Sequence, residues 1–123
     1  GCGIAIISPA RLSAQAFAAV RRSQPGGAIH GGEWETSLLL HLSPEVVDMS
    51  QATDVDVMRY RSDFVAGDNF TGSQRVTWST WHLQPSQTGL YGDPTVATAE
   101  TGRVIMEAAV SEGARFLREF YSH

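Results

Sequence analysis

The sequence predicts an α/β chain in which a short parallel or mixed sheet packs against helices. Three observations support this fold class: a short apolar run near the N-terminus, an alanine-rich segment after it, and two later segments with helical periodicity. A short strand without polar residues is typical of the interior of parallel sheets. With 123 residues the chain forms one domain or a piece of one.

The first predicted elements are a strand and the helix that follows it. Residues 4–7 read Ile-Ala-Ile-Ile, and we expect a strand buried on both faces. The next helix covers 10–22, with Pro9 at its entry, where a missing N–H costs nothing. It ends at Arg21 and Arg22, whose charges suit the helix dipole. Its predicted buried stripe is Leu12, Ala16, Ala19 and Val20.

The segment 30–42 carries most of the polar chemistry of the chain. After a turn at 23–27, we expect a helix from near Gly31 to about Leu42. Helical spacing would place five residues on one face: His30, Glu33, Trp34, Ser37 and His41. The flanks and back would carry Glu35, Leu38, Leu39 and Leu42. This pattern predicts that the first turn of the helix lines a pocket.

The second half of the chain gives weaker signals until its last helix. Residues 50–75 show little periodicity, and 76–81 are rich in β-branched and aromatic residues, as in a strand or extended arm. Asp93 is a candidate cap for a helix over about 94–121. The apolar stripe of that helix would be Ala99, Met106, Ala109, Val110, Gly113, Leu117 and Phe120.

Composition excludes several classes of protein. The net charge is −4 and all nine basic residues are arginine, without a cluster that would serve general nucleic-acid binding. Cys2 is the single cysteine, so neither an intrachain disulfide nor a cysteine-based zinc site can form. No apolar run approaches the ~20 residues that span a bilayer. We expect a cytoplasmic chain without membrane contact, and the start at glycine suggests processing or a fragment.

Two blocks of the sequence resemble the creatininase (creatinine amidohydrolase) family. Residues 30–40, HGGEWETSLLL, and 43–49, SPEVVDM, are similar to the family's His-Ala/Gly-Gly-x-x-Glu-Thr-Ser helix and the Pro-Glu-Leu-Val-Asp-Met after it. Residues 89–102, GLYGDPTVATAETG, resemble the stretch that opens the family's last helix. The resemblance implies the C-terminal half of a three-layer α/β/α domain.

The resemblance also implies a divalent-metal cofactor, zinc or manganese. Members bind two ions through a Glu-x-His pair, a following Asp and a Gly-His-x-Glu/Gly-Asn segment of the N-terminal half, and none of these motifs occurs here. No histidine precedes His30, so we assign no metal ligand in this chain. We expect a homo-oligomer or a separate chain that supplies the missing half.

The resemblance implies that two residues are catalytic. His30 matches the family histidine that faces the metal centre and is thought to shuttle a proton, and Glu35 matches the glutamate of the Glu-Thr-Ser block. Amide hydrolysis needs an acid that protonates the departing nitrogen, which suits a histidine beside a carboxylate. The candidate substrate-binding residues for a small-molecule substrate are Glu33, Trp34 and Ser37. Residues 26–29 lack the aromatic gate of creatinine-specific members, which argues against creatinine.

Each candidate also has a structural interpretation. The helix dipole favours Glu33 and Glu35 in a first turn without any function, and for Glu33 we favour that interpretation. Trp side chains more often pack in a core or interface than bind ligands, which applies to Trp34, Trp78 and Trp81, and we expect His41 to be solvated or structural.

Three functions stay open: a metal-dependent hydrolase of a cyclic amide or related C–N bond within a larger assembly, a non-catalytic interaction module, and a small-ligand-binding protein.

Overall fold

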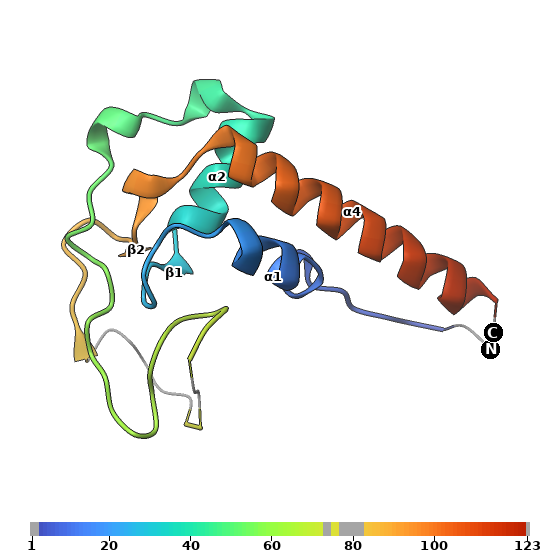
Figure 1. Ribbon diagram of the computed structural model, residues 1–123, viewed down its shortest axis with the longest axis horizontal. Helices are drawn as coiled ribbons and strands as arrows, with labels where there is room; N and C mark the ends of the chain where they lie inside the picture. Colours follow the sequence, from blue (N-terminus) through green and yellow to red (C-terminus); the bar gives the residue numbers. More distant parts are fainter. Residues whose placement is uncertain (1–2, 73–74, 77–82, 123) are drawn as a thin grey trace.

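A computed structural model describes residues 3–72, 75–76 and 83–122 of the chain. Its helices are α1 (Pro9–Val20), α2 (Glu33–Leu42) and α4 (Ala99–Tyr121), and its strands are β1 (Ala28–His30) and β2 (Tyr91–Gly92) (Figure 1). Three short 3₁₀ turns complete the elements: η1 (Pro44–Val46), η2 (Met49–Gln51) and η3 (Pro94–Val96). The mixed α/β class is confirmed, with helices as the larger part.

The sheet differs from the prediction. β1 and β2 pair antiparallel, with Ala28 opposite Gly92 and His30 opposite Tyr91. In the described ranges this two-stranded ladder is the whole sheet, and neither a parallel sheet nor a three-layer arrangement is seen there. The ladder joins the segment before α2 to the loop before η3.

Residues 4–7, which were expected to form a buried strand, belong to no strand in the described ranges, and they are exposed. Ile4 is 88 % exposed and Ile6 is 97 % exposed. The segment runs beside the C-terminal part of α4, where Gly3 lies against the ring of Phe120 (Figure 1). The prediction of burial on both faces is therefore wrong for this chain, because the described residues place no strand beside the segment.

Helix α1 begins at Pro9 with Ser8 as its N-cap and ends two residues before the predicted end. Its buried residues are Ser13 and Phe17, whereas Ala19 of the predicted stripe is exposed. Burial of Ser13 is tolerated because its hydroxyl donates to the Pro9 carbonyl oxygen at 2.8 Å. The core centres on Phe17, Ala28 and Ile105, with Trp34, Leu38 and Phe70 packed around it.

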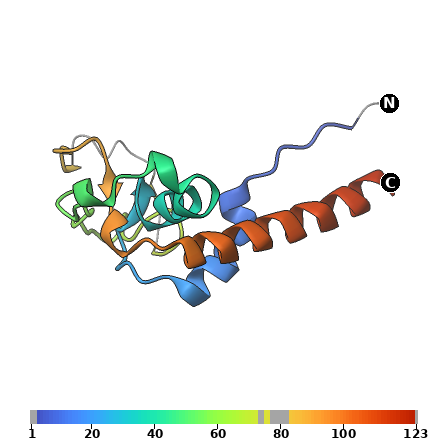
Figure 2. The ribbon, with the colours of Figure 1, turned by 90° about the horizontal axis from the view of Figure 1, so that it is seen from above.

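Helix α4 is the longest element and packs against both other helices (Figures 1 and 2). It begins at Ala99 rather than near 94, because Asp93 caps the separate turn η3 and Thr98 caps α4. Of the predicted stripe only Gly113 is buried, together with Thr101, Gly102 and Ile105. The C-terminal part of α4 extends beyond the body of the chain (Figure 2), which explains why Val110 and Leu117 are exposed.

Two remaining predictions concern the strand over 76–81 and membrane contact. Residues 77–82, with Trp78, Trp81 and His82, lie outside the described residues, so the strand expected over 76–81 stays a prediction. None of the described helices is both long and apolar enough to cross a membrane.

Candidate functional site

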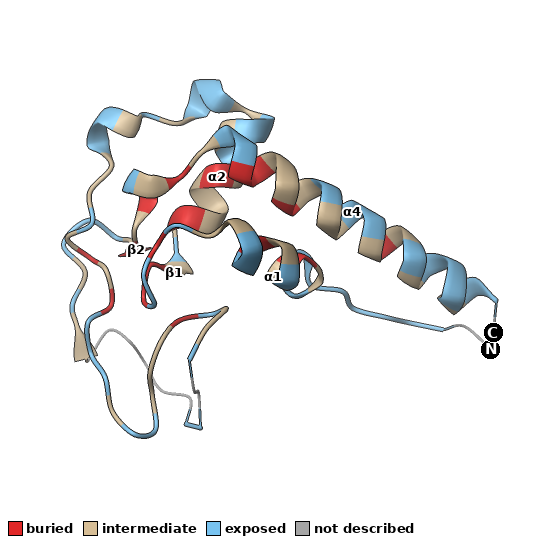
Figure 3. Ribbon diagram, viewed as in Figure 1, coloured by how far each residue is buried: buried red, intermediate tan, exposed pale blue. Residues whose placement is uncertain are grey.

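Helix α2 turns part of its polar face toward the core of the chain. Glu33 and Ser37 are fully buried, whereas Leu39 and Leu42 are about half exposed (Figure 3). The Ser37 carbonyl oxygen touches α4 so closely that a Cβ built on Gly102 would stand 1.9 Å from it. Small and hydrogen-bonded residues allow this contact. As a result, the polar face of α2 packs against α4.

Glu33 joins the start of α2 to the end of α1. Its carboxylate accepts hydrogen bonds from the backbone N–H of Arg22, at 2.9 and 3.1 Å, and of Ser23, at 2.7 Å. These amides follow the last turn of α1 and receive a charged acceptor inside the protein. The geometry gives Glu33 a structural role, and its contact with substrate stays a prediction.

Ser37 and Trp34 are also held by the fold. The Ser37 hydroxyl accepts from the backbone N–H of Thr98 at 3.1 Å, just before α4 begins. The Trp34 indole N–H donates to the Ser13 hydroxyl at 3.2 Å, and its ring stacks on Phe70 with centroids 6.0 Å apart. Both side chains connect α2 to its neighbours, and neither is shown to bind substrate.

His30 is exposed at the end of β1 and does not belong to α2. Gly31 has a φ of +63°, a left-handed conformation that turns the chain from the strand into the helix. A Cβ at that position would also stand 2.5 Å from Leu90. The predicted common face of His30 with Glu33 and Ser37 is therefore wrong, because the turn separates the histidine from the helical repeat.

Glu35 has an unusual environment for a carboxylate. Its Oε2 atom is buried and has no hydrogen-bond partner among the described residues. Helical spacing places Glu35 on the face of α2 that carries Leu38, Leu39 and Leu42. A buried carboxylate oxygen without a donor is costly. It marks a position where a proton, a cation or an N–H from outside the described residues would be stabilising.

Two aspartates that the sequence did not single out organise the loops around β1. Asp68 is fully buried in an ion pair with Arg21, and it also accepts from the backbone N–H of Gly26 at 2.7 Å. Burial by itself would raise the pKa of Asp68. The hydrogen bonds from Arg21, Phe70 and Gly26 outweigh this effect, so the pKa lies below its ordinary value.

Asp56 fastens the loop that precedes β2. It accepts hydrogen bonds from the Ser86 hydroxyl and from the backbone N–H groups of Gln87 and Thr88, at 2.8–2.9 Å. The hydrogen bond from the Thr88 hydroxyl contributes most to a pKa of about 2. The Ser, Thr and Gly residues after Pro85 were the sequence signal that could have indicated this loop, since loops of this composition commonly hydrogen-bond to a carboxylate.

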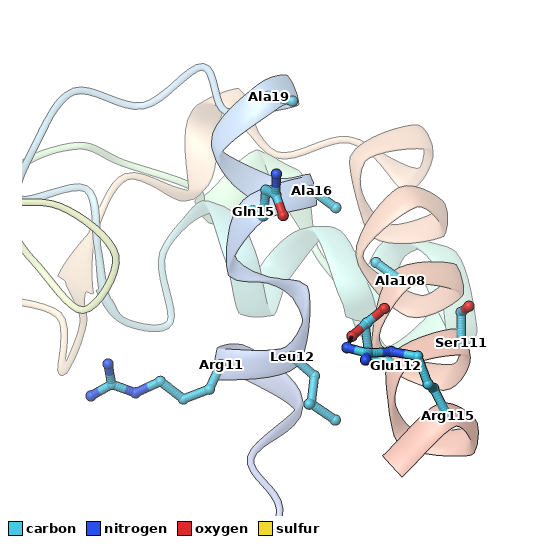
Figure 4. Close-up of a pocket in the computed structure, with 9 residues that line it drawn as sticks. All are labelled: Arg11, Leu12, Gln15, Ala16, Ala19, Ala108, Ser111, Glu112 and Arg115. Atoms are coloured by element: carbon cyan, nitrogen blue, oxygen red, sulfur yellow. Dashed lines mark hydrogen bonds and ion pairs between the residues drawn. The ribbon is translucent and has the colours of Figure 1, made fainter. Parts of the chain in front are cut away.

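A hollow of about 690 Å³ lies between α1 and α4, away from β1 (Figure 4). Small side chains such as Ala16 and Ala108 line its middle. Its carboxylate, Glu112, is paired with Arg115, and Arg11 points away from α4 (Figure 4). This groove holds no histidine or unpaired acid, so it offers no acid–base chemistry.

The described residues by themselves do not provide the metal centre that the family implies. Across the described ranges no three residues among His, Cys, Asp and Glu gather closely enough to hold an ion. Within residues 30–35, where Glu33 already accepts backbone hydrogen bonds, His30 and Glu35 are the side chains that could contribute a ligand atom. A binuclear centre needs more ligands than these two residues provide.

These features define an α/β chain whose polar block surrounds a strand–glycine–helix turn. Residues 6–117 match the family model of creatinine amidohydrolase, and the chain belongs to this creatininase family. The match confirms the resemblance that blocks 30–49 and 89–102 indicated.

Two curated relatives are mycofactocin precursor peptide peptidases of Mycobacterium tuberculosis, from strains CDC 1551 / Oshkosh and ATCC 25618 / H37Rv. Each is 38 % identical to this chain over 91 residues, which is 74 % of this chain and 32 % of the relative. The chain therefore spans about one third of the length of these relatives. No solved structure shows significant similarity.

Proposed function

We propose that this chain is the proton-handling part of a metal-dependent amidohydrolase. The observation that carries the proposal is the block 30–35. There, an exposed histidine and a carboxylate with one oxygen that lacks a hydrogen-bond donor among the described residues flank a left-handed glycine turn. The block lies within the region matched by the family model. An amide C–N bond is the reacting group that the family name implies.

The residues suit the departure of an amine. An imidazole carries and releases a proton near neutral pH, so His30 would protonate the leaving nitrogen. Exposure leaves that side chain accessible to a substrate. The Oε2 atom of Glu35, which has no donor among the described residues, would accept a hydrogen bond from a protonated group or from the substrate. The remaining ligands for divalent ions would come from polypeptide outside this chain.

A peptide amide is our first candidate substrate, and a cyclic amide is the second. The two curated relatives are named as peptidases of a precursor peptide, and their identity to this chain is 38 %. The cyclic amide follows from the creatinine amidohydrolase family as a whole. Both substrates release an amine from an acyl group, so the role of His30 is the same.

A non-catalytic interaction module is the alternative function. It is favoured by the lack of a three-residue metal cluster within the described ranges. In that case His30 and Glu35 would be present in the chain without catalysing a reaction.

A covalent chimera tests the proposal. Residues 6–117 replace the matching region of the M. tuberculosis peptidase, and bound metal and cleavage of its precursor peptide are measured. We expect cleavage, and we expect His30→Gln to lower kcat by about 10²- to 10⁴-fold. Glu35→Gln should lower it as well.

The matched control is His41→Gln, which changes an exposed histidine at the other end of α2 and should leave kcat unchanged. A folded chimera that binds metal but cleaves nothing would reject the proposal in favour of the interaction module. So would equal activity of the His30→Gln variant and the unmodified chimera.

A further inference from the structure

We propose that Asn69 is a positioning residue for His30. Its side-chain amide donates a hydrogen bond to the carbonyl oxygen of Ile29, the residue directly before the histidine, at 2.8 Å. This contact fixes the direction in which the imidazole leaves the backbone. The inference deepens the proposed function, because it rests on the role of His30 as the proton donor of the reaction.

The His30 side chain is not held by contacts of its own. It is exposed, and its imidazole makes no hydrogen bond with the described residues. For such a residue the backbone sets where the side chain begins to point, because the Cα–Cβ bond follows the backbone conformation. The position of the imidazole therefore depends on what fixes the chain at residues 29 and 31.

The backbone before His30 departs from regular strand geometry. The three residues of β1, from Ala28 to His30, face the two residues of β2, and the register shifts between them. Ile29 is therefore the extra residue of a β-bulge. A bulge redirects the neighbouring side chain and leaves the extra residue outside the regular ladder. The Ile29 carbonyl oxygen needs a donor from elsewhere, and the Asn69 amide supplies it.

Asn69 fastens β1 at two points. Its backbone N–H donates to the Ala28 carbonyl oxygen at 3.3 Å, and its side-chain Nδ2 donates to that of Ile29 at 2.8 Å. Successive carbonyl groups of a regular strand point to opposite sides. A single residue that reaches both of them fits the distorted backbone of a bulge better than a regular strand. Together the two hydrogen bonds hold the residues before His30 in the bulged conformation.

The loop that carries Asn69 is fixed by the two neighbours of this residue. Asp68 is fully buried in its ion pair with Arg21. Phe70 packs on Phe17 of the core, with ring centroids 4.8 Å apart. Asn69 stands between these two anchors and is itself exposed. The fold therefore places the amide firmly beside β1, although the core does not depend on that side chain.

The contact requires the chemistry of asparagine. A side-chain amide is a donor, whereas the ionised carboxylate of an aspartate of the same size would face the Ile29 carbonyl oxygen with a second acceptor. The shorter side chain of alanine leaves that oxygen without its donor and keeps the backbone N–H of residue 69. Asn69→Ala therefore removes the proposed fastening of Ile29 and leaves the second hydrogen bond, to Ala28, in place.

Nuclear magnetic resonance of the purified chain tests the proposal. In Asn69→Ala we expect the carbonyl carbon of Ile29 to change its chemical shift, because it loses a hydrogen bond. We also expect the residual dipolar coupling of the His30 Cα–Cβ bond to change, because that coupling reports the orientation of the bond. Circular dichroism should stay the same, since Asn69 is exposed.

Gln84→Ala is the matched control. The Gln84 amide also donates to a backbone carbonyl oxygen at 2.8 Å, but its partners are Val57 and Arg59 rather than residues of β1. This variant should leave the resonances and couplings of Ile29 and His30 as they are in the unmodified chain. The Tm of Asn69→Ala should not fall further than that of the control, because each variant loses a side-chain amide donor.

Kinetics of the chimera with the M. tuberculosis peptidase test the consequence for catalysis. Asn69→Ala should lower kcat about 10- to 100-fold, because a displaced proton donor no longer meets the departing nitrogen. KM should stay unchanged, since the contact acts on the transition state rather than on substrate binding. Gln84→Ala should leave both constants unchanged.

Three results would overturn the inference. The first is an Asn69→Ala variant with the same Ile29 shift and His30 coupling as the unmodified chain, and the second is an equal change in the Gln84→Ala control. The third is an active chimera whose kcat does not respond to Asn69→Ala. An unmodified chimera without activity would count against the proposed function instead, and the resonance measurements would then decide whether Asn69 positions His30.

Discussion

Glu33 and Glu35 stand two positions apart on α2 and meet opposite environments. Glu33 is fully buried and accepts three hydrogen-bond contacts from backbone amides at the end of α1. Glu35 has a buried oxygen that accepts none from the described residues. One carboxylate therefore stabilises the fold, while the other keeps a buried oxygen without a hydrogen-bond donor among the described residues.

Replacement of Glu33 should destabilise the chain. In Glu33→Gln the amide presents an N–H₂ group to backbone donors that need an acceptor, so we expect the free energy of unfolding to fall by about 2 kcal/mol. Urea unfolding followed by circular dichroism measures this change. The matched variant Glu35→Gln should cost less, since no backbone donor depends on that side chain. Equal losses would contradict the structural role of Glu33.

Asp56 should make the loop before β2 sensitive to acid. Its pKa is lowered from 3.8 to about 2 by the hydrogen bonds from Thr88, Gln87 and Ser86. Since the pKa is lower in the folded chain, the stabilisation is complete above about pH 4 and is lost as the pH falls through about 2. The amide proton shifts of Gln87 and Thr88 should titrate with that midpoint. In Asp56→Asn this titration should be absent.

Among the elements, the crossing of α2 and α4 depends on one glycine. Gly102 lets the backbone of α4 approach the carbonyl oxygen of Ser37, and the Ser37 hydroxyl accepts from Thr98 in the same crossing. Backbone contact of this kind excludes larger side chains. It also explains why Glu33 and Ser37 of α2 are buried while Leu39 and Leu42 are about half exposed.

Two alanine substitutions on α4 should therefore have opposite effects. Gly102→Ala places a Cβ 1.9 Å from the Ser37 carbonyl oxygen and should lower stability by about 1–3 kcal/mol. Gly113→Ala meets Leu12 at an ordinary 3.7 Å and should gain up to about 1 kcal/mol from helix propensity. Thermal unfolding of both variants measures the difference. A stabilising Gly102→Ala would show that the two helices do not touch there.

At the scale of the whole molecule, the described part of the chain buries little of its apolar surface. Six hydrophobic side chains are buried there, whereas twelve large ones are exposed, among them Ile4, Ile6 and Leu42. Ordinary monomers rarely show large contiguous apolar surfaces unless these bind something. The small core agrees with a chain that spans about one third of the length of its relatives.

The sequence predicted the helices better than their contacts. The starts and ends of α1 and α2 followed from caps, proline and periodicity, which act over a few residues. The burial of Glu33 and Ser37 on α2 did not follow from the sequence, because the residues that contact α4 were not known. Asp56 and Asp68 gave no signal in their own neighbourhood, since many of their partners lie 30–47 positions away.

By itself the sequence determined the helical segments and the family, because both are encoded in residue type and short-range spacing. Only the tertiary structure decided that Gly31 separates His30 from α2, that Glu33 closes the end of α1, and that residues 4–7 stay unpaired. These outcomes depend on contacts between distant segments, which local patterns do not specify.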